Sequence, residues 1–165
     1  YKRQGPSALD IPGLSCAELT LKEILALPFE FARTAKLAKE VGFGGVQIHA
    51  AHGFLLSQFL SPLFNKRDDD YGGSITNRMR LLLEVLDAVR SAVGSGFPVA
   101  IKLNATDQLE GGFDKDDALR VIAALDKTGI DLIDVSGGTY FPGARSASDS
   151  AGAVSYTHLT LPTIE

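Results

Sequence analysis

Three short apolar segments constrain the fold of this chain more than any other feature. They span residues 45–48, 97–104 and 130–135. Segments of helical periodicity end just before each of them, in residues 20–42, 76–93 and 114–129. Helices and strands that alternate at about 30 to 50 residues per unit require parallel strands joined by right-handed crossovers. The sequence therefore predicts an α/β protein with a parallel sheet.

Composition limits the classes of partner. A length of 165 residues suits one ordinary core, and 45% hydrophobic with 22% charged residues is typical of a soluble globular protein. The net charge of -4 gives no general attraction to nucleic acid or to anionic membranes, and no apolar run approaches a bilayer span. The single cysteine, Cys16, excludes an internal disulfide. We expect a cytoplasmic protein without nucleic-acid or membrane partners.

Local signals set the expected helix boundaries. Residues 1–19 lack periodicity and are predicted to be loop. Thr20 and Glu23 have the spacing of a capping box, and Pro28 is expected to kink the following helix or to begin a new one. Asp114 is a good N-cap for the last helix. Residues 55–62 are predicted to form a short helical turn that the proline ends.

Each predicted strand carries two polar residues of the same parity near its carboxyl end. The pairs are Gln47 with His49, Lys102 with Asn104, and Asp134 with Ser136. Side chains alternate along a strand, so each pair shares one face. Lys102 lies within an apolar run and needs an anionic or hydrogen-bonding partner.

Two architectures fit this pattern: a doubly wound open sheet and part of a (β/α)₈ barrel. An open nucleotide-binding sheet would show a Gly-x-Gly-x-x-Gly turn after its first strand, and the chain has none. A barrel carries polar and reactive groups at the carboxyl ends of successive strands. The polar pairs therefore favour a partial (β/α)₈ barrel.

His49 and His52 are the candidate catalytic residues. Two histidines three residues apart at the end of a strand, followed by Gly53, indicate a reactive site more strongly than a single histidine does. A metal site is the alternative, because imidazoles at this spacing can share a cation. Its third ligand would have to come from the acidic run at residues 68–70. That run is typical of a solvated surface, although Arg67 beside it could instead pin the loop through charge-assisted hydrogen bonds.

Two long motifs bring a known family into view. They are HAAHGFLLSQFLSP at residues 49–62 and NKRDDDYGGS at residues 65–74. In order and separation they closely resemble the signature of the old yellow enzyme family, the NADH:flavin oxidoreductases that hold FMN in a (β/α)₈ barrel. The likeness runs from about Thr20 to Gly152. It implies that the three predicted strands are barrel strands four to six.

The resemblance also implies an activity. His49 and His52 match the pair that hydrogen-bonds the carbonyl oxygen of an activated alkene, and Lys102 matches the basic residue at the pyrimidine edge of the flavin. Hydride would pass from NADH or NADPH through FMN to an activated alkene, a quinone or a similar small electrophile. Imidazole donors suit this chemistry because negative charge develops on the substrate oxygen. The pattern gives no protein partner beyond a possible homo-oligomer of the full-length enzyme.

Two departures from the family pattern bear on activity. Many members have tyrosine at the position of Phe54, where its hydroxyl protonates the substrate, so alkene reduction is expected to be slow unless Tyr140 or water supplies the proton. Phe54 and Tyr140 are assigned to the substrate pocket. The resemblance also implies that the family's first two strands and its last two, which carry the FMN phosphate site, are absent from this sequence.

The chain is therefore expected to be the central part of a barrel over residues 1–153, inactive alone, with a non-native or misread tail at 154–165. The alternatives are a non-catalytic barrel piece and a His/Asp metal hydrolase on the same fold.

Overall fold

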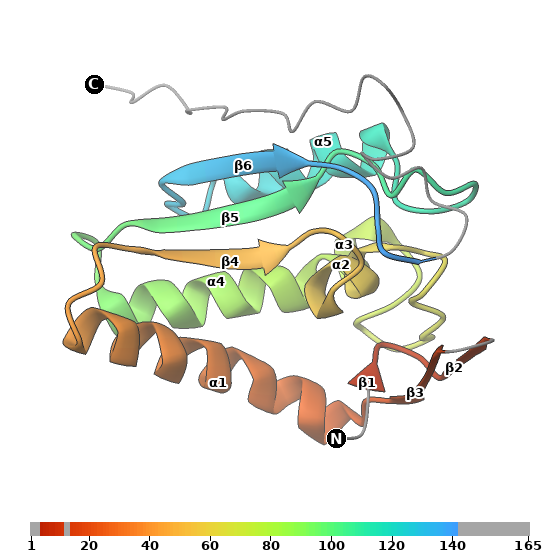
Figure 1. Cartoon of the computed structure of the whole chain (residues 1–165), viewed down its shortest axis with the longest axis horizontal. Helices are drawn as coiled ribbons and strands as arrows, with labels where there is room; N and C mark the ends of the chain where they lie inside the picture. Colours follow the sequence, from red (N-terminus) through yellow and green to blue (C-terminus); the bar gives the residue numbers. More distant parts are fainter. Residues whose placement is uncertain (1–3, 12–13, 142–165) are drawn as a thin grey trace.

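The computed structural model describes residues 4–11 and 14–141. A parallel sheet forms its centre, with strands β4 (Val46–Ala50), β5 (Val99–Asn104) and β6 (Leu132–Ser136) in that order (Figure 1). The predicted parallel strands are thus confirmed. The register pairs His49 with Lys102 and Lys102 with Asp134, so the predicted polar residues share one face of the sheet.

The described residues form five helices. They are α1 (Leu21–Glu40), α2 (Leu55–Leu60), α3 (Ile75–Arg78), α4 (Arg80–Val93) and α5 (Lys115–Leu125). The predicted capping box of α1 is present, with both Thr20 and Glu23 satisfying free amides, and Asp114 caps α5. Pro28 lies inside α1, which neither ends nor restarts there. No helix in residues 4–11 and 14–141 is long and apolar enough to cross a membrane.

The core lies between one face of the sheet and the helices α4 and α5. Side chains of opposite parity to the polar row point into it, and Ile48, Ile101 and Ile133 are each at most 4% exposed. Val85 from α4 and Val121 from α5 are fully buried against them. Burial of apolar area on this face stabilises the sheet and leaves its other face available for polar groups.

The amino-terminal segment corrects one prediction. Residues 4–18 include three short strands, β1 (Gln4–Gly5), β2 (Leu9–Ile11) and β3 (Leu14–Glu18), in the order β1-β3-β2. The prediction of a loop across this segment was wrong because strands of two to five residues are too short to show a period. β1 pairs parallel with β3, and β2 pairs antiparallel with β3. This backbone pairing orders a segment whose sequence shows no period.

Arg67 pins the charged loop to this segment. Its guanidinium donates to the carbonyl oxygens of Pro6 at 2.9 Å and Leu19 at 2.8 Å, and it pairs with Asp69 at 2.6 Å. The Arg67 side chain is only 7% exposed. Gly72 is packed so closely that a Cβ there would lie 2.1 Å from the Arg67 carbonyl oxygen. The pinned-loop alternative is therefore the one the structure shows, although Asp68 and Asp70 remain exposed.

The predicted helix over residues 76–93 is divided at Met79 into α3 and α4. Arg78 is only 6% exposed, although arginine is rarely buried without a partner. It donates to the carbonyl oxygens of Gly73 and Leu60 and pairs with Asp117 at 2.8 Å. The helix pattern could not show this burial because two of the partners, Leu60 and Asp117, lie far from Arg78 in the sequence.

Candidate active site

A row of polar side chains crosses the sheet near the carboxyl ends of its strands. His49, Lys102 and Asp134 are register partners on β4, β5 and β6, on the face turned away from the core. Lys102 forms an ion pair with Asp134, and the Gln47 amide donates to the same carboxylate at 3.1 Å. The partner that Lys102 was predicted to need is therefore Asp134. The Lys102 side chain keeps 27% of its area exposed, so the ammonium is held in place but remains accessible.

His52 lies just beyond β4 and is held by groups from the other two strands. Its backbone N–H donates to the Asn104 Oδ1 at 3.2 Å, and its Nε2 shares a hydrogen bond of 2.6 Å with the Ser136 hydroxyl. Its ring meets that of His49 edge to face, with centroids 5.3 Å apart. The structure thus brings the two predicted histidines together, on the same side of the sheet as Lys102.

A buried polar network supports this arrangement. Asn104 is 1% exposed and donates to the carbonyl oxygen of Gly138 at 2.8 Å and to Asp107 at 3.3 Å. Asp107, also 1% exposed, accepts from the backbone N–H of Phe113 at 3.0 Å. Burial raises the pKa of Asp107 above its ordinary value, against the opposing effect of these hydrogen bonds. Sequence reasoning assigned no role to Asp107, because its partners are set by the path of the loop.

Both histidines are stabilised in their neutral forms. Partial burial is the main cause that lowers the pKa of His49, and the positive charges of His52 and Lys102 lower it further. Burial and Lys102 also lower the pKa of His52, while Asp134 partly opposes them. A neutral imidazole carries one N–H donor and one acceptor nitrogen. At neutral pH each ring can therefore donate one hydrogen bond.

Two exposed aromatic rings flank the histidines. The Phe54 ring lies 4.8 Å from His49 and 5.5 Å from Tyr140, measured between centroids. Phe54 and Tyr140 are 51% and 54% exposed. Gln58 donates to the Tyr140 hydroxyl at 3.4 Å. The two residues assigned to a substrate pocket thus lie together beside the histidine pair, and their role in binding stays a prediction.

The alternative of a metal site lacks a third ligand in the part of the chain that the structure describes. In residues 4–11 and 14–141, no three His, Cys, Asp or Glu side chains are grouped closely enough to hold a metal ion. Asp69, the acidic side chain with the most contacts in the run at 68–70, accepts from Arg67 and from the backbone N–H of Tyr71. These bonds lower the pKa of Asp69 and hold its carboxylate within the loop.

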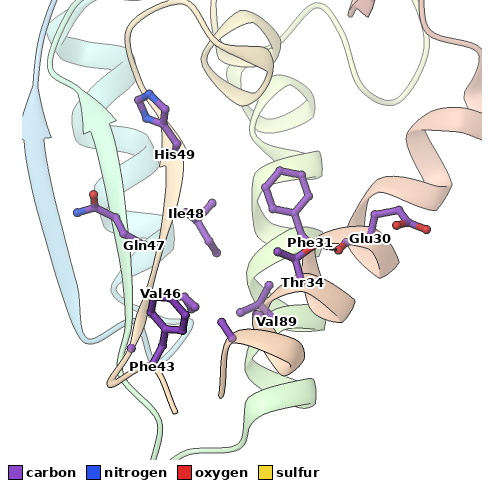
Figure 2. A pocket seen from close by; sticks show the side chains of 12 residues that line it. Glu30, Phe31, Thr34, Phe43, Val46, Gln47, Ile48, His49 and Val89 are labelled. Atoms are coloured by element: carbon purple, nitrogen blue, oxygen red, sulfur yellow. Dashed lines mark hydrogen bonds between the residues drawn. The ribbon is translucent and has the colours of Figure 1, made fainter. Parts of the chain in front are cut away.

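An apolar groove of about 510 Å³ lies on the other side of β4, against α1 (Figure 2). Figure 2 shows Ile48 pointing toward the helices, with Phe31 and Val89 facing it, while Gln47 points away. Phe43, which also lines the groove, is 64% exposed. Only His49 and Gln47 at its border connect the groove with the polar row.

A family model described as the NADH:flavin oxidoreductase / NADH oxidase family matches residues 5–160. The chain belongs to this family. The resemblance to the old yellow enzymes is thereby confirmed. FMN is the cofactor of this family, with NADH or NADPH as co-substrate. The predicted boundary at residue 153 lies outside the described residues and stays a prediction.

Two relatives and one solved structure place the chain more closely. It is 44% identical over 123 residues to the NADH-dependent flavin oxidoreductase iliE of Neonectria sp. (strain DH2), covering 74% of this chain and 16% of that protein. It is 43% identical over 140 residues to the NADPH dehydrogenase of Bacillus licheniformis, covering 84% of this chain and 41% of that protein. The chain therefore spans less than half the length of either relative.

The old yellow enzyme homologue from Zymomonas mobilis superposes with a TM-score of 0.75 at 28% identity, over 86% of this chain and 46% of that chain. This similarity, with the parallel order β4-β5-β6, confirms the predicted fold class, a part of a (β/α)₈ barrel. The face that carries the polar row corresponds to the inside of such a barrel.

Proposed function

We propose that the enzyme containing this chain transfers hydride from NADH or NADPH, through FMN, to an activated alkene, a quinone or a similar small electrophile. One observation carries the proposal. The rings of His49 and His52 meet at 5.3 Å at the end of β4, on the face where Lys102 is held by Asp134. The proposal rests on two imidazole donors and one cation at the carboxyl ends of neighbouring strands, the edge at which barrel enzymes carry their active sites.

The residues present fit FMN in charge and position. Bound FMN would accept hydride from the nicotinamide and deliver it to the substrate. Lys102 would lie at the pyrimidine edge of the flavin, where its ammonium favours the negative charge that reduction brings. The ion pair with Asp134 and the bond from Gln47 to that carboxylate fix the direction of Lys102.

The histidines would bind the substrate. His49 and His52 each offer one N–H to the carbonyl or quinone oxygen, and these bonds strengthen as negative charge develops there. Phe54 and Tyr140 would form the adjoining wall, where exposed aromatic area favours an apolar substrate body. The names of the two relatives include one NADH-dependent and one NADPH enzyme, so both nicotinamides belong in the proposal.

Stopped-flow kinetics of the two half-reactions tests the proposal. In the flavoprotein that contains this chain, His49→Ala and His52→Ala should each slow oxidation of the reduced enzyme by an enone by about 10²- to 10³-fold, the typical effect of removing one oxyanion donor. Thr34→Ala, on α1 at the border of the groove, is the matched control and should leave the rate unchanged. Full activity in both histidine variants would contradict the proposal, and metal-dependent hydrolysis without flavin would support the metal hydrolase alternative.

A further inference from the structure

His52 has an unusual backbone conformation for a residue with a side chain. Its φ is 60°, in the left-handed region that a Cβ disfavours. Such a conformation persists only where the surrounding structure holds it. The contacts of the His52 backbone therefore decide where its imidazole points.

Asn104 supplies the side-chain contact to that backbone. Its Oδ1 accepts from the His52 N–H at 3.2 Å, and its Nδ2 donates to the carbonyl oxygen of Gly138 at 2.8 Å. The backbone N–H of Tyr140 also donates to the His52 carbonyl oxygen, at 3.3 Å. One buried side chain on β5 thus ties the segment that follows β4 to the segment that follows β6.

The amide of Asn104 can take only one orientation here. Its NH₂ group faces two acceptors, the Gly138 carbonyl and the Asp107 carboxylate, and its oxygen faces the N–H of His52. A flipped amide would set its oxygen against both acceptors and its NH₂ against a donor. Asp107 is itself fixed by the backbone N–H of Phe113. The acceptor offered to His52 is therefore held in place before any substrate binds.

We propose that Asn104 is a positioning residue for His52. By accepting from the His52 N–H it maintains the left-handed turn after β4, and this turn directs the imidazole toward Ser136 and His49. The kinetic consequence rests on the proposed function, in which His52 donates to the substrate oxygen. The positioning itself can be measured without turnover.

Three substitutions separate positioning from general stability. Asn104→Leu removes the acceptor to His52 and the donors to Gly138 and Asp107. Asn104→Asp keeps an acceptor for His52 but loses both donors and adds a carboxylate next to Asp107. Val121→Ala, in the fully buried core of α5, lowers stability without contact to His52 and is the control.

The first measurement is the backbone conformation of His52, from the ¹³Cα and ¹³Cβ chemical shifts of selectively labelled histidine in the flavin-loaded protein. His52→Ala assigns the signal. We expect left-handed shifts in the wild type, in N104D and in V121A, and their loss in N104L. Wild-type shifts outside the left-handed range, unchanged shifts in N104L, or loss of the shifts in N104D as in N104L would overturn the proposal. The last result would mean that Asn104 acts only through its donors to the loops.

The second measurement is the rate at which the reduced protein transfers hydride to an enone. N104L should lower it by about 10²-fold, because a displacement of about 1 Å in a reacting group has an effect of that size. N104D should restore most of the rate, and V121A should retain it. If His52→Ala itself leaves the rate unchanged, the proposed function fails while the chemical shifts still test the positioning. A normal rate in N104L with displaced His52 shifts would refute the kinetic consequence.

Discussion

The two sides of β4 differ in chemistry. Polar side chains on one side are bonded to their neighbours, and apolar side chains on the other side line an open groove. On one side lies the carboxyl-end cluster, which comprises His49, His52, Lys102, Asn104, Asp107, Asp134 and Ser136. Its members are joined to one another or to neighbouring groups by hydrogen bonds of 2.6 to 3.3 Å and by the Lys102–Asp134 ion pair, apart from His49, which meets the cluster through ring contacts. On the other side lies the α1–β4 groove, which is apolar and has exposed Phe43 at its border.

This difference shows that the polar side chains of the site can be arranged although the described part of the barrel is not closed. Side chains from β4, β5 and β6 and from the loops that follow them arrange the cluster, because parallel strands bring their carboxyl ends to one edge. In the described residues, β4 pairs only with β5, and nothing described covers the groove. The local chemistry is thus set within this chain, whereas the apolar surface beside it is open.

The largest effect on stability is expected at Arg67, which holds the charged loop against the amino-terminal segment. Arg67→Ala would leave the carbonyl oxygens of Pro6 and Leu19 and the Asp69 carboxylate without their donor, and should lower the free energy of unfolding by about 3 kcal/mol. Arg33→Ala is the matched control, because the Arg33 side chain is 70% exposed and pairs with Glu30 on the surface of α1. Urea unfolding measures both. Equal losses of unfolding free energy in the two variants would show that the bonds of Arg67 stabilise the fold no more than an exposed ion pair does.

A second large effect concerns proton transfer beside the cluster. Phe54→Tyr places a phenol 4.8 Å, by ring centroid, from His49, and general-acid help is typically worth about 10²- to 10⁴-fold. Enone reduction should rise by some part of that range, while flavin reduction by NADH or NADPH stays nearly unchanged. Stopped-flow measurement of both half-reactions checks this.

Tyr140→Phe is the companion variant for Phe54→Tyr. Tyr140 accepts from Gln58 and lies 5.5 Å from the Phe54 ring, so it is the competing proton donor. An unaltered rate in Phe54→Tyr, or loss of enone reduction in Tyr140→Phe alone, would show that Phe54 is only a packing residue.

The polar row could be predicted from the sequence, but the hydrogen bonds that hold its side chains in place could not. His49, Lys102 and Asp134 could be aligned because strand side chains alternate and parallel strands share one edge. The bond from His52 to Asn104 joins residues 52 positions apart. It depends on the paths of two loops, for which the sequence has no period. The same reason accounts for the unexpected burial of Arg78 and for the missed strands β1 to β3.

The pH dependence of stability should report on the histidine pair. Folded-state pKa values below the ordinary 6.5 mean that the unfolded state binds more protons as the pH falls. Stability should therefore decrease as the pH falls through the ordinary histidine pKa of 6.5. The double variant His49→Asn, His52→Asn should have a shallower slope, measured from urea midpoints across this range. A slope equal to that of the wild type would show that groups other than the histidine pair dominate the titration.

The smallest effect on stability is expected for a substitution of Phe43. The same substitution gives the sharpest test of whether the groove is open. A free strand edge beside exposed apolar side chains favours association, so the isolated 165-residue chain should aggregate and should not bind FMN tightly.

Phe43→Lys should change the free energy of unfolding by no more than about 0.5 kcal/mol, because the side chain is 64% exposed. It should nevertheless reduce aggregation, measured by light scattering. Leu119→Lys on α5 is the matched control, since Leu119 is also 64% exposed but lies away from the groove. If association proceeds through the groove, only the Phe43 variant will remain dispersed. Equal improvement in both would mean that net charge, and not the groove, governs solubility. A yellow, monodisperse wild-type monomer would refute the prediction that the isolated chain aggregates and does not bind FMN tightly.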